Sequence, residues 1–304
     1  MPSNNNLLSA GDKTTGENSL LSGNPNRNLY VGGVDYLDNL NDSDKNAIMS
    51  SKVKYFIPWR LVFNQNSVTT ESRLVFDASC SPRDNNSLNS LLAKGTNNMN
   101  KLVVILIKWR THLVAFHTDV RKMYNTVRLD KKHWQYHLYF FDQKLRLGVR
   151  PRIKVIKTAM YGTRSSGNVA ESAIRKVAEI NKEKFPKAYD VITKDFYVDD
   201  CLSGAETVEA AHQLADQLTS SIAPGGFLLK GFIFSGQDPP EHLTKDGKTV
   251  LVGGLRFSPK EDKINLKIPE LNFNKTIRGI KLEIKVKFFT NFTKKLFESS
   301  ARGF

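Results

Sequence analysis

Cysteine is scarce in this chain, and long apolar runs are absent from it. The only two cysteines among the 304 residues are Cys80 and Cys201, too few for a disulfide framework or a four-sulfur zinc site. The longest apolar run, Leu102–Ile107, ends at Lys108 and is far shorter than the roughly 18 residues of a membrane span. The first residues have neither the basic start nor the apolar stretch of a secretory signal. These absences favour an intracellular protein with no membrane partner.

Several signatures of catalysis and metal binding are also missing. The sequence has no Ser-His-Asp signature and no glycine-rich phosphate loop. His133 and His137 would share one face of a helix, but the alternating pattern through Phe140 favours a strand, so we expect no metal site there. His112 and His117 have no acid or cysteine at ligand spacing. The histidines therefore do not indicate a function.

The charge of the chain is strongly basic and unevenly spread. The 45 Lys and Arg exceed the 30 Asp and Glu, for a net charge of +15. Residues 1–50 hold three basic residues and six acids, so the remaining residues carry +18. A basic body of this size favours a polyanionic partner such as nucleic acid. A soluble basic protein without such a partner explains the charge equally well, so charge alone does not decide between the two.

Apolar spacing and helix caps predict the order of the elements. Residues 1–50 have the composition and low periodicity of a flexible extension, and we expect ordered structure from about Lys54. A helix is predicted over 98–111. After it come a strand over 113–120, a helix over 165–185, two strands over 191–204 with a turn at the acids, a helix over 206–223 and a strand over 227–235. This order is that of a ferredoxin-like split βαβ antiparallel sheet, so the predicted fold class is α+β.

The predicted topology brings three carboxylates together. The first and third strands of such a sheet are antiparallel neighbours, so Asp119 would lie beside Asp199 and Asp200 at the hairpin turn. Three acids at this spacing repel one another unless a cation compensates them. Oxygen ligands suit Mg²⁺, and two such ions about 4 Å apart clamp an in-line displacement at phosphorus. An Asp-Asp pair taken alone is more often a solvated turn, and that alternative stays open here.

Six segments resemble motifs of reverse transcriptases, in the same order along the chain. Phe196–Asp200 (FYVDD) resembles the YxDD signature of that family. RLVFD (73–77) resembles the fingers arginine motif, and HTDVRKMY (117–124) resembles the first palm motif. YGTRSSGN (161–168) resembles the loop that opens the palm helix. GGFLLKGF (225–232) resembles the palm lysine segment, and LVGGLRFSP (251–259) resembles the primer grip. The wording is most similar to the BEL/Pao class of LTR retrotransposons, over roughly residues 51–259.

The resemblance implies a catalytic centre made of Asp119, Asp199 and Asp200. Asp119 and Asp199 would bind two Mg²⁺ ions, or Mn²⁺ in their place, with Asp200 beside them and the carbonyl of Val120 as an added ligand. The 3′-OH of a primer would attack the dNTP. Catalysis would then rest on positioning and charge neutralisation, without a protein nucleophile.

The resemblance also implies a nucleotide site. Arg73 and Asp77 belong to the fingers motif, whose arginine would hold the β- and γ-phosphates through bidentate contacts. Tyr124 would lie under the incoming sugar and exclude a 2′-OH, with Tyr161 packed near the same nucleotide. Lys230 would protonate the departing pyrophosphate. Outside the motif context, Arg73 is an ordinary surface residue, Tyr124 is core packing and Lys230 is a solvated side chain.

The resemblance further implies a right-hand polymerase with helices on one face of the palm sheet. The primer grip would use Gly253, Gly254 and Leu255, whereas Cys201 would be a small buried residue. Fingers are expected over 51–98 and 128–163, palm over 99–127 and 164–259, and a basic tail over 260–304. That tail holds 11 basic residues and five acids, and its alternating segment 280–292 is typical of a strand, not of a helical thumb.

The favoured interpretation is the polymerase core of a retrotransposon reverse transcriptase. Its partners would be an RNA or DNA template with a primer, a dNTP and other products of the same element, in the cytoplasm or within virus-like particles. An inactive nucleic-acid-binding remnant is the alternative, because no thumb is recognised. A two-metal nuclease is the third reading, but the matches at Arg73 and Tyr124 would then have no purpose.

Overall fold

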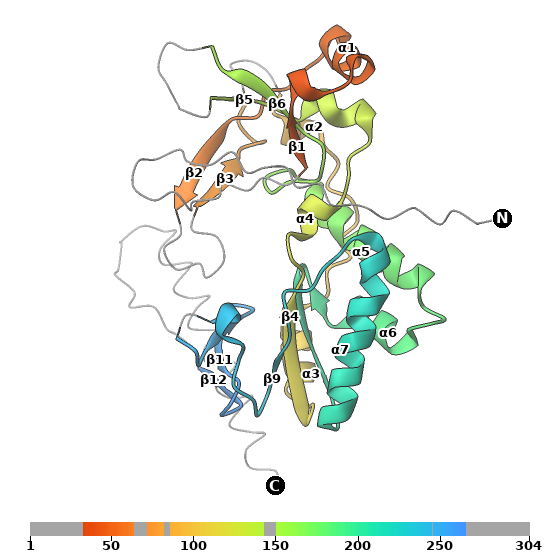
Figure 1. Ribbon diagram of the computed structural model, residues 1–304, viewed down its shortest axis with the longest axis vertical. Helices are drawn as coiled ribbons and strands as arrows, with labels where there is room; N and C mark the ends of the chain where they lie inside the picture. The colour runs from red at the N-terminus through yellow and green to blue at the C-terminus, as the bar shows by residue number, and fades with distance from the viewer. Residues whose placement is uncertain (1–32, 64–71, 82–85, 143–149, 245, 266–304) are drawn as a thin grey trace, which may run out of the picture. The chain divides into compact units, whose positions relative to one another are not determined.

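The chain folds into two compact units with mixed helices and antiparallel sheets. The computed structural model describes residues 33–63, 72–81, 86–142, 150–244 and 246–265 (Figure 1). One unit contains residues 1–98 and 122–174, and the other contains residues 99–121 and 175–304. Every ladder between the described strands is antiparallel. The predicted α+β class is therefore confirmed.

The first unit is built on a three-stranded sheet and a hairpin. The sheet has the order β1 (Val34–Tyr36), β6 (Arg152–Ile156), β5 (Leu138–Phe141), and the hairpin pairs β2 (Trp59–Phe63) with β3 (Ser72–Phe76). The helices of this unit are α1 (Asp42–Ser50), α2 (Leu88–Leu91), α4 (Met123–Thr126) and the first turns of α5 (Ser166–Ile180), with a 3-10 helix over Lys131–Tyr136. Its core contains apolar residues from the sheet, from the hairpin region and from α2, including Ile57, Phe76, Leu88, Tyr139 and Ile156.

Ordered structure begins earlier than the sequence predicts. We expected it from about Lys54, but β1 pairs with β6, and α1 begins behind an Asn41 side chain that accepts a 2.9 Å hydrogen bond from the Asp44 amide. Leu37 and Ile48 form a small core with two residues of β5 and β6. The polar composition of this segment concealed it, because its stability comes from partners about 100 residues further along the chain. The rest of the predicted extension, residues 1–32, lies outside the described residues.

The strand predicted from His133 is also wrong over its first half. Residues 131–136 form a 3-10 helix, and β5 begins only at Leu138. The side chain of Asp130 caps this helix by accepting a 3.1 Å hydrogen bond from the amide of Lys132. Residues 131–136 are therefore helical because the Asp130 cap favours a helical turn there. The alternating apolar pattern of this segment is too short to impose a strand.

The second unit is built on a four-stranded sheet. Its order is β7 (Phe196–Tyr197), β8 (Asp200–Ala205), β4 (Val114–Asp119), β9 (Ile233–Phe234). Its helices are α3 (Leu102–Trp109), α6 (Pro186–Lys194), α7 (Val208–Ile222) and the last turns of α5. In α7, Thr207 caps the start by accepting from the Ala210 amide, and Leu214, Leu218 and Ile222 are buried at helical spacing. Figure 1 shows α7 running beside β4.

Helices cover both faces of this sheet among the described residues, and not one face as predicted. Ile233 packs in a cluster with Ile105, Leu106 and Trp109 of α3, whereas the ring of Phe234 lies 4.2 Å from the ring of His212 on α7. Consecutive strand residues point to opposite faces, so α3 and α7 lie on opposite sides. A helix also covers the second face because the sequence of α3 is strongly apolar, and its apolar side chains are buried by packing against that face of the sheet.

A second, three-stranded sheet completes the cluster on the α3 side. It consists of β10 (Val250–Val252), β11 (Leu255–Ser258) and β12 (Lys263–Asn265). Phe257 meets Trp109 edge-on, with ring centroids 4.8 Å apart. The strand β12 lies in what the sequence suggested was an unrecognised tail; residues 266–304, with the predicted strand at 280–292, lie outside the described residues.

Three predicted boundaries in this unit shift. The helix over 165–185 ends at Ile180, and the strand expected from 191 begins only at Phe196, because α6 starts at Pro186 and continues to Lys194. Proline is well suited to the first turn of a helix, so Pro186, which follows the predicted helix over 165–185, begins a new helix here. The strand expected over 227–235 is reduced to β9, since Gly231 has a φ of +133°.

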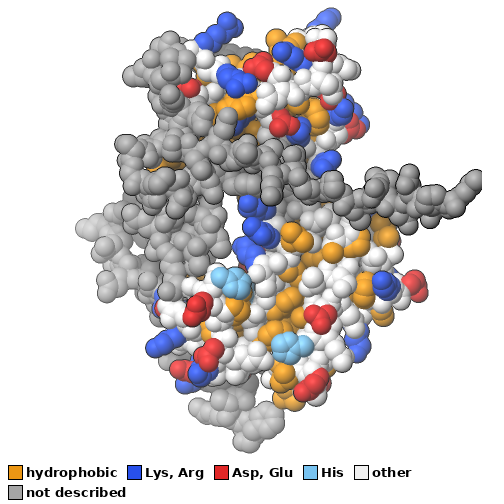
Figure 2. Space-filling model, in the orientation of Figure 1, with side chains coloured by type: hydrophobic (Ala, Val, Ile, Leu, Met, Phe, Trp, Pro, Cys, Tyr) orange, Lys and Arg blue, Asp and Glu red, His pale blue; other side chains and the backbone are white. Residues whose placement is uncertain are grey.

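The surface of the second unit is partly apolar. Ile180, Val208 and Leu228 are exposed, and Figure 2 shows hydrophobic side chains gathered on the visible face of this unit. None of the helices in the described part of the chain is long and apolar enough to cross a membrane.

Candidate active site

The three predicted carboxylates come together at one end of the β4–β8 ladder. Asp119, the last residue of β4, pairs directly with Asp200, the first residue of β8. Asp199 precedes it in the turn, and its carbonyl accepts a 2.8 Å hydrogen bond from the amide of Val120. The predicted adjacency of the two strands is confirmed, and it places acids that are distant in sequence at one edge of one sheet.

The turn that carries Asp199 is under backbone strain. Tyr197 pairs with Asp200, so Val198 and Asp199 form the two-residue connection between β7 and β8. Val198 has a φ of +57°, in the left-handed region that a β-branched side chain rarely adopts. Such a conformation costs about 1–3 kcal/mol and persists only where the surroundings hold it. The rest of the second unit therefore has to impose the shape of this turn.

Burial and mutual repulsion raise the proton affinity of two of the acids. Burial raises the pKa of Asp119, and the nearby Lys230 opposes the rise. Burial, followed by the charges of Asp119 and Asp200, raises the pKa of Asp199 to about 6. The cluster thus resists carrying all of its negative charge, which is the electrostatic condition that a bound cation would relieve.

Lys230 lies directly against the cluster. Its amide donates a 2.9 Å hydrogen bond to the carbonyl of Asp119, and its ammonium nitrogen lies 2.8 Å from Asp119 Oδ1. The contact gives this carboxylate oxygen, which is shielded from solvent, a positive countercharge. Lys230 therefore lies at the acid cluster as an ion-pair partner of Asp119, and its catalytic role stays a prediction.

His117 is a contact that the sequence analysis missed. Its Nε2 lies 3.1 Å from Asp200 Oδ1, its side chain is buried, and its Nδ1 has no hydrogen-bond partner. The signal was present in the strand period, because His117 and Asp119 are two residues apart and so lie on one face of β4. The residues of β8 that pair with His117 and Asp119 lie on this same face of the sheet.

The acid cluster suits a divalent cation in its ligand atoms and its negative charge, but not in its present geometry. Carboxylate and carbonyl oxygens at Asp119, Asp199 and Val120 are the ligands that Mg²⁺ prefers. Among the described residues, however, no three His, Cys, Asp or Glu side chains converge closely enough to hold a metal ion. Asp119 is paired with Lys230, and Asp200 contacts His117. These two contacts would have to loosen for the acids to share an ion.

Two predicted nucleotide-site residues lie together in the first unit. The rings of Tyr124 and Tyr161 are tilted against each other, with centroids 4.4 Å apart. The loop after Tyr161 is held by Asn89, whose side chain donates to the Gly162 carbonyl at 2.8 Å and accepts from the Arg164 amide at 2.7 Å. Asn89 is a second residue that the sequence analysis missed, since nothing in the pattern of α2 connects it to this loop.

The two predicted fingers residues differ in what the structure describes. Arg73 lies on β3 opposite Val62, but its side chain lies outside the described residues. The carboxylate of Asp77 accepts a 3.0 Å hydrogen bond from the amide of Ser79, and its own amide donates to the carbonyl of Pro58 at 2.8 Å. Asp77 thus shapes a turn after β3.

The predicted primer-grip residues form the turn between β10 and β11. Gly253 and Gly254 both have positive φ, +54° and +84°, which explains why two glycines stand in succession. Leu255 is buried in the cluster around α3 and pairs with Val252 in the β10–β11 ladder, so its side chain serves packing. Cys201 is buried, as expected, and burial raises the pKa of its thiol well above the ordinary value.

Comparison with known proteins bears on the fold alone. No protein-family model matches the sequence, and no curated protein matches it. Among solved structures, the chain is similar to the foamy viral protease–reverse transcriptase in complex with an RNA/DNA hybrid, with a TM-score of 0.51 and 12% sequence identity. The match covers 83% of this chain and 31% of that chain, so this chain spans about a third of the length of its neighbour. The chain therefore has a reverse-transcriptase-like fold.

Proposed function

We propose that the chain is the fingers and palm of an RNA-directed DNA polymerase of the BEL/Pao class of retrotransposons. The observation that carries the proposal is the pairing of Asp119 with Asp200 beside a two-residue turn that holds Asp199. This arrangement comes from the FYVDD and HTDVRKMY segments, which resemble the two acidic palm motifs of the family. In this reading the four-stranded sheet of the second unit is the palm, and the first unit supplies the fingers.

The reaction is the transfer of a nucleotide from a dNTP to the 3′-OH of a primer. The 3′-OH gives its proton to solvent water, and its oxygen forms a bond to the α-phosphorus. The bond from that phosphorus to the oxygen bridging to the β-phosphate breaks, and pyrophosphate is released. Asp119, Asp199 and the carbonyl of Val120 would hold Mg²⁺ or Mn²⁺, which when bound supplies countercharge to the triphosphate. The raised pKa values of Asp119 and Asp199 support this role, because they come from burial first and from the neighbouring acids second, and a bound cation would offset both by favouring the charged carboxylates.

The remaining roles are assigned by motif position. We assign Arg73 to the phosphates of the incoming nucleotide and Tyr124 to the exclusion of a 2′-OH. Tyr161, whose ring contacts that of Tyr124, is assigned to packing near the same nucleotide. Lys230 would leave its ion pair with Asp119 once a cation compensates the acid, and would then protonate the departing pyrophosphate. Gly253 and Gly254 would offer backbone amides to the primer strand.

The proposed partner is a primed RNA or DNA template. The charge of +18 on residues 51–304 supports a polyanion, and the foamy viral neighbour is bound to an RNA/DNA hybrid. Binding to such a hybrid should weaken steeply as salt rises, because phosphate contacts release counterions.

Primer extension tests the proposal. The full chain, supplied with oligo(dT) on poly(rA), dTTP and Mg²⁺, is expected to lengthen the primer. Asp199→Asn and Asp119→Asn should abolish the product while remaining folded. Asp190→Asn, an exposed acid paired with Lys194 on α6, is the matched control and should extend normally. Undiminished synthesis by Asp199→Asn would overturn the assignment.

An inactive nucleic-acid-binding remnant is the second candidate. It is favoured by the absence of three converging metal-binding side chains among the described residues and by the pairing of Asp119 with Lys230. Such a protein would bind the primed hybrid with the same salt dependence and add no nucleotide with either Mg²⁺ or Mn²⁺. The extension assay and a binding titration on the same hybrid separate the two candidates.

A further inference from the structure

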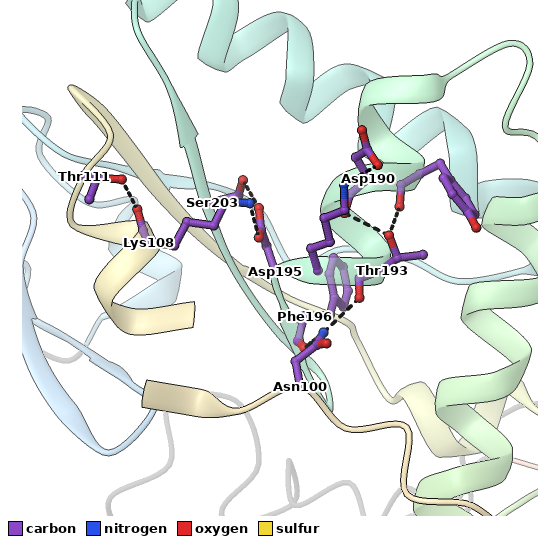
Figure 3. Close-up of polar contacts among 10 residues, drawn as sticks. Asn100, Lys108, Thr111, Asp190, Thr193, Asp195, Phe196 and Ser203 are labelled. Atoms are coloured by element: carbon purple, nitrogen blue, oxygen red, sulfur yellow. Dashed lines mark hydrogen bonds and ion pairs between the residues drawn. The ribbon is translucent and has the colours of Figure 1, made fainter. Parts of the chain in front are cut away.

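A buried acid, Asp195, lies four residues before Asp199. The side chain of Asp195 is only 1% exposed. One of its oxygens lies 2.5 Å from the ammonium of Lys108 on α3, and the other accepts a 2.7 Å hydrogen bond from the hydroxyl of Ser203 on β8 (Figure 3). A buried carboxylate is costly unless it is paired and hydrogen-bonded, and both of these partners are present.

The backbone of Asp195 is fixed as firmly as its side chain. Its amide donates a 2.8 Å hydrogen bond to the carbonyl of Val191 at the end of α6, and its carbonyl accepts a 3.1 Å hydrogen bond from the amide of Leu202. With its side-chain contacts, this one residue joins α3, α6 and β8. It stands at the point where the chain leaves α6 and enters β7.

Asn100 secures the same segment from a second direction. Its side-chain amide lies 3.0 Å from the carbonyl of Thr193 and 3.0 Å from that of Phe196, and donates to both (Figure 3). Residues 193–196 are thus held on both sides of Asp195. Beyond them β7 contributes only Phe196 and Tyr197 before the turn begins.

The turn therefore depends on what fixes the start of β7. A two-residue strand supplies little ladder of its own, and Val198 holds a strained left-handed conformation that the surroundings must impose. We propose that Asp195, clamped between Lys108 and Ser203, is a positioning residue that sets the register of the β7–β8 hairpin and thereby the placement of Asp199 and Asp200. The inference rests on the proposed function, since it gives these two acids a chemical role.

A merely structural role makes a different prediction from a positioning role. If Asp195 served stability alone, its replacement would lower the fraction of folded protein and leave each folded molecule with unchanged metal affinity. If it positions the hairpin, folded molecules should themselves bind the cation less well. Support residues behind metal ligands commonly change metal affinity or activity by about 10–100-fold.

The first experiment compares Asp195→Asn with the wild-type full chain. Mn²⁺ binding is followed by the electron paramagnetic resonance signal of the free ion, without primer or nucleotide, on samples whose folded fraction is known from circular dichroism. Asp195→Asn is expected to weaken Mn²⁺ binding about tenfold. In primer extension it should raise the Mg²⁺ concentration for half-maximal rate and lower kcat, with little change in KM for the dNTP. Asp190→Asn, which breaks an exposed Asp–Lys pair on α6, is the matched control.

A second variant covers the case in which Asp195→Asn does not fold. Ser203→Ala removes one hydrogen bond and leaves the pair between Asp195 and Lys108 intact, so it should shift Mn²⁺ affinity in the same direction and by less. Wild-type metal affinity and Mg²⁺ dependence in folded Ser203→Ala and Asp195→Asn would overturn the inference while the proposed function stands. A wild-type chain that binds Mn²⁺ through Asp199 but extends no primer would overturn the proposed polymerase function. The Mn²⁺ affinities of the variants would then still decide whether Asp195 positions the hairpin. A wild-type chain with no Mn²⁺ affinity would overturn both.

Discussion

The amide of Val120 donates a 2.8 Å hydrogen bond to the carbonyl of Asp199. This single bond joins the residue after Asp119 to the residue before Asp200, where β4 and β8 meet. The backbone connection between the two acidic segments therefore continues from the Asp119–Asp200 pair into the turn. A ligand that binds Asp119 and Asp199 together should stabilise the whole edge of the sheet.

Divalent cations should stabilise the wild-type chain against heat. An ion at ten times its dissociation constant adds about 1.4 kcal/mol to the free energy of unfolding, which raises Tm by roughly 3–6 °C for a domain of this size. Asp199→Asn should lose most of this shift, while Asp190→Asn keeps it. Thermal melts followed by circular dichroism, with Mg²⁺ and with chelator, provide the measurement. Equal shifts in all three proteins would place the ion elsewhere.

Val198→Asn should stabilise the chain in the absence of metal. Asparagine tolerates the left-handed region better than a β-branched residue, so relief of the +57° φ is expected to add about 1 kcal/mol to the free energy of unfolding. Val104→Asn, at an exposed helical position of α3, has no such strain to relieve and should give no gain. Urea unfolding of the two variants and the wild type decides the matter. A loss at position 198 would mean that side-chain packing outweighs the strain.

Two glycines in the YGTRSSGN segment should respond oppositely to alanine. Gly162 has a φ of +105°, and a Cβ there would lie 2.3 Å from the carbonyl oxygen of Phe76, so Gly162→Ala should cost about 1–3 kcal/mol. A Cβ at Gly167, in the first turn of α5, would meet only the Tyr124 hydroxyl at 3.9 Å. Gly167→Ala should gain about 0.5–1 kcal/mol through helix propensity. Urea midpoints that change in the same direction would contradict this account.

The stability of the first unit should fall in mild acid because of His137. Burial lowers the pKa of His137 below its ordinary 6.5, and its Nδ1 lies 3.0 Å from the carbonyl of His133. The unfolded chain therefore takes up the proton first as the pH falls. Stability is complete above about pH 6.5 and is lost as the pH drops from there towards the lowered folded value.

Unfolding in urea at about pH 8 and about pH 5 measures this loss. His137→Gln should reduce the difference between the two conditions, whatever its effect on absolute stability. The exposed His133→Gln keeps the backbone carbonyl and removes only the minor effect of the His133 charge on His137, so it should retain most of the wild-type difference. An unchanged difference in His137→Gln would assign the acid sensitivity to another group.

The sequence predicted the β4–β8 edge well because three independent signals coincide there. Asp119 ends a buried apolar run, Asp199 and Asp200 sit between two short apolar runs, and the helix over 206–223 has Glu206 and Glu209 in its first turn and Pro224 after its end. Each signal is local, and the split βαβ order then fixes which strand ends meet.

The contacts that the sequence did not predict are those between distant partners. β1 is stabilised by pairing with β6, and Asp195 is buried only because Lys108 and Ser203 reach it from α3 and β8. A polar residue within a polar stretch gives no pattern that distinguishes burial from solvation. The face of β4 that His117 shares with Asp119 was readable, but its contact with Asp200 required the register of the ladder.

The contrast between the two cysteines has a practical consequence. Cys201 lies beside Asp200, is fully buried and has a raised thiol pKa, whereas Cys80 is exposed on the other unit. A maleimide dye should therefore react with Cys80 alone while the chain is folded, and with both thiols once it unfolds. The natural sequence thus supplies a single-site handle for fluorescence on the first unit, and a built-in reporter of unfolding next to the acidic edge of the second.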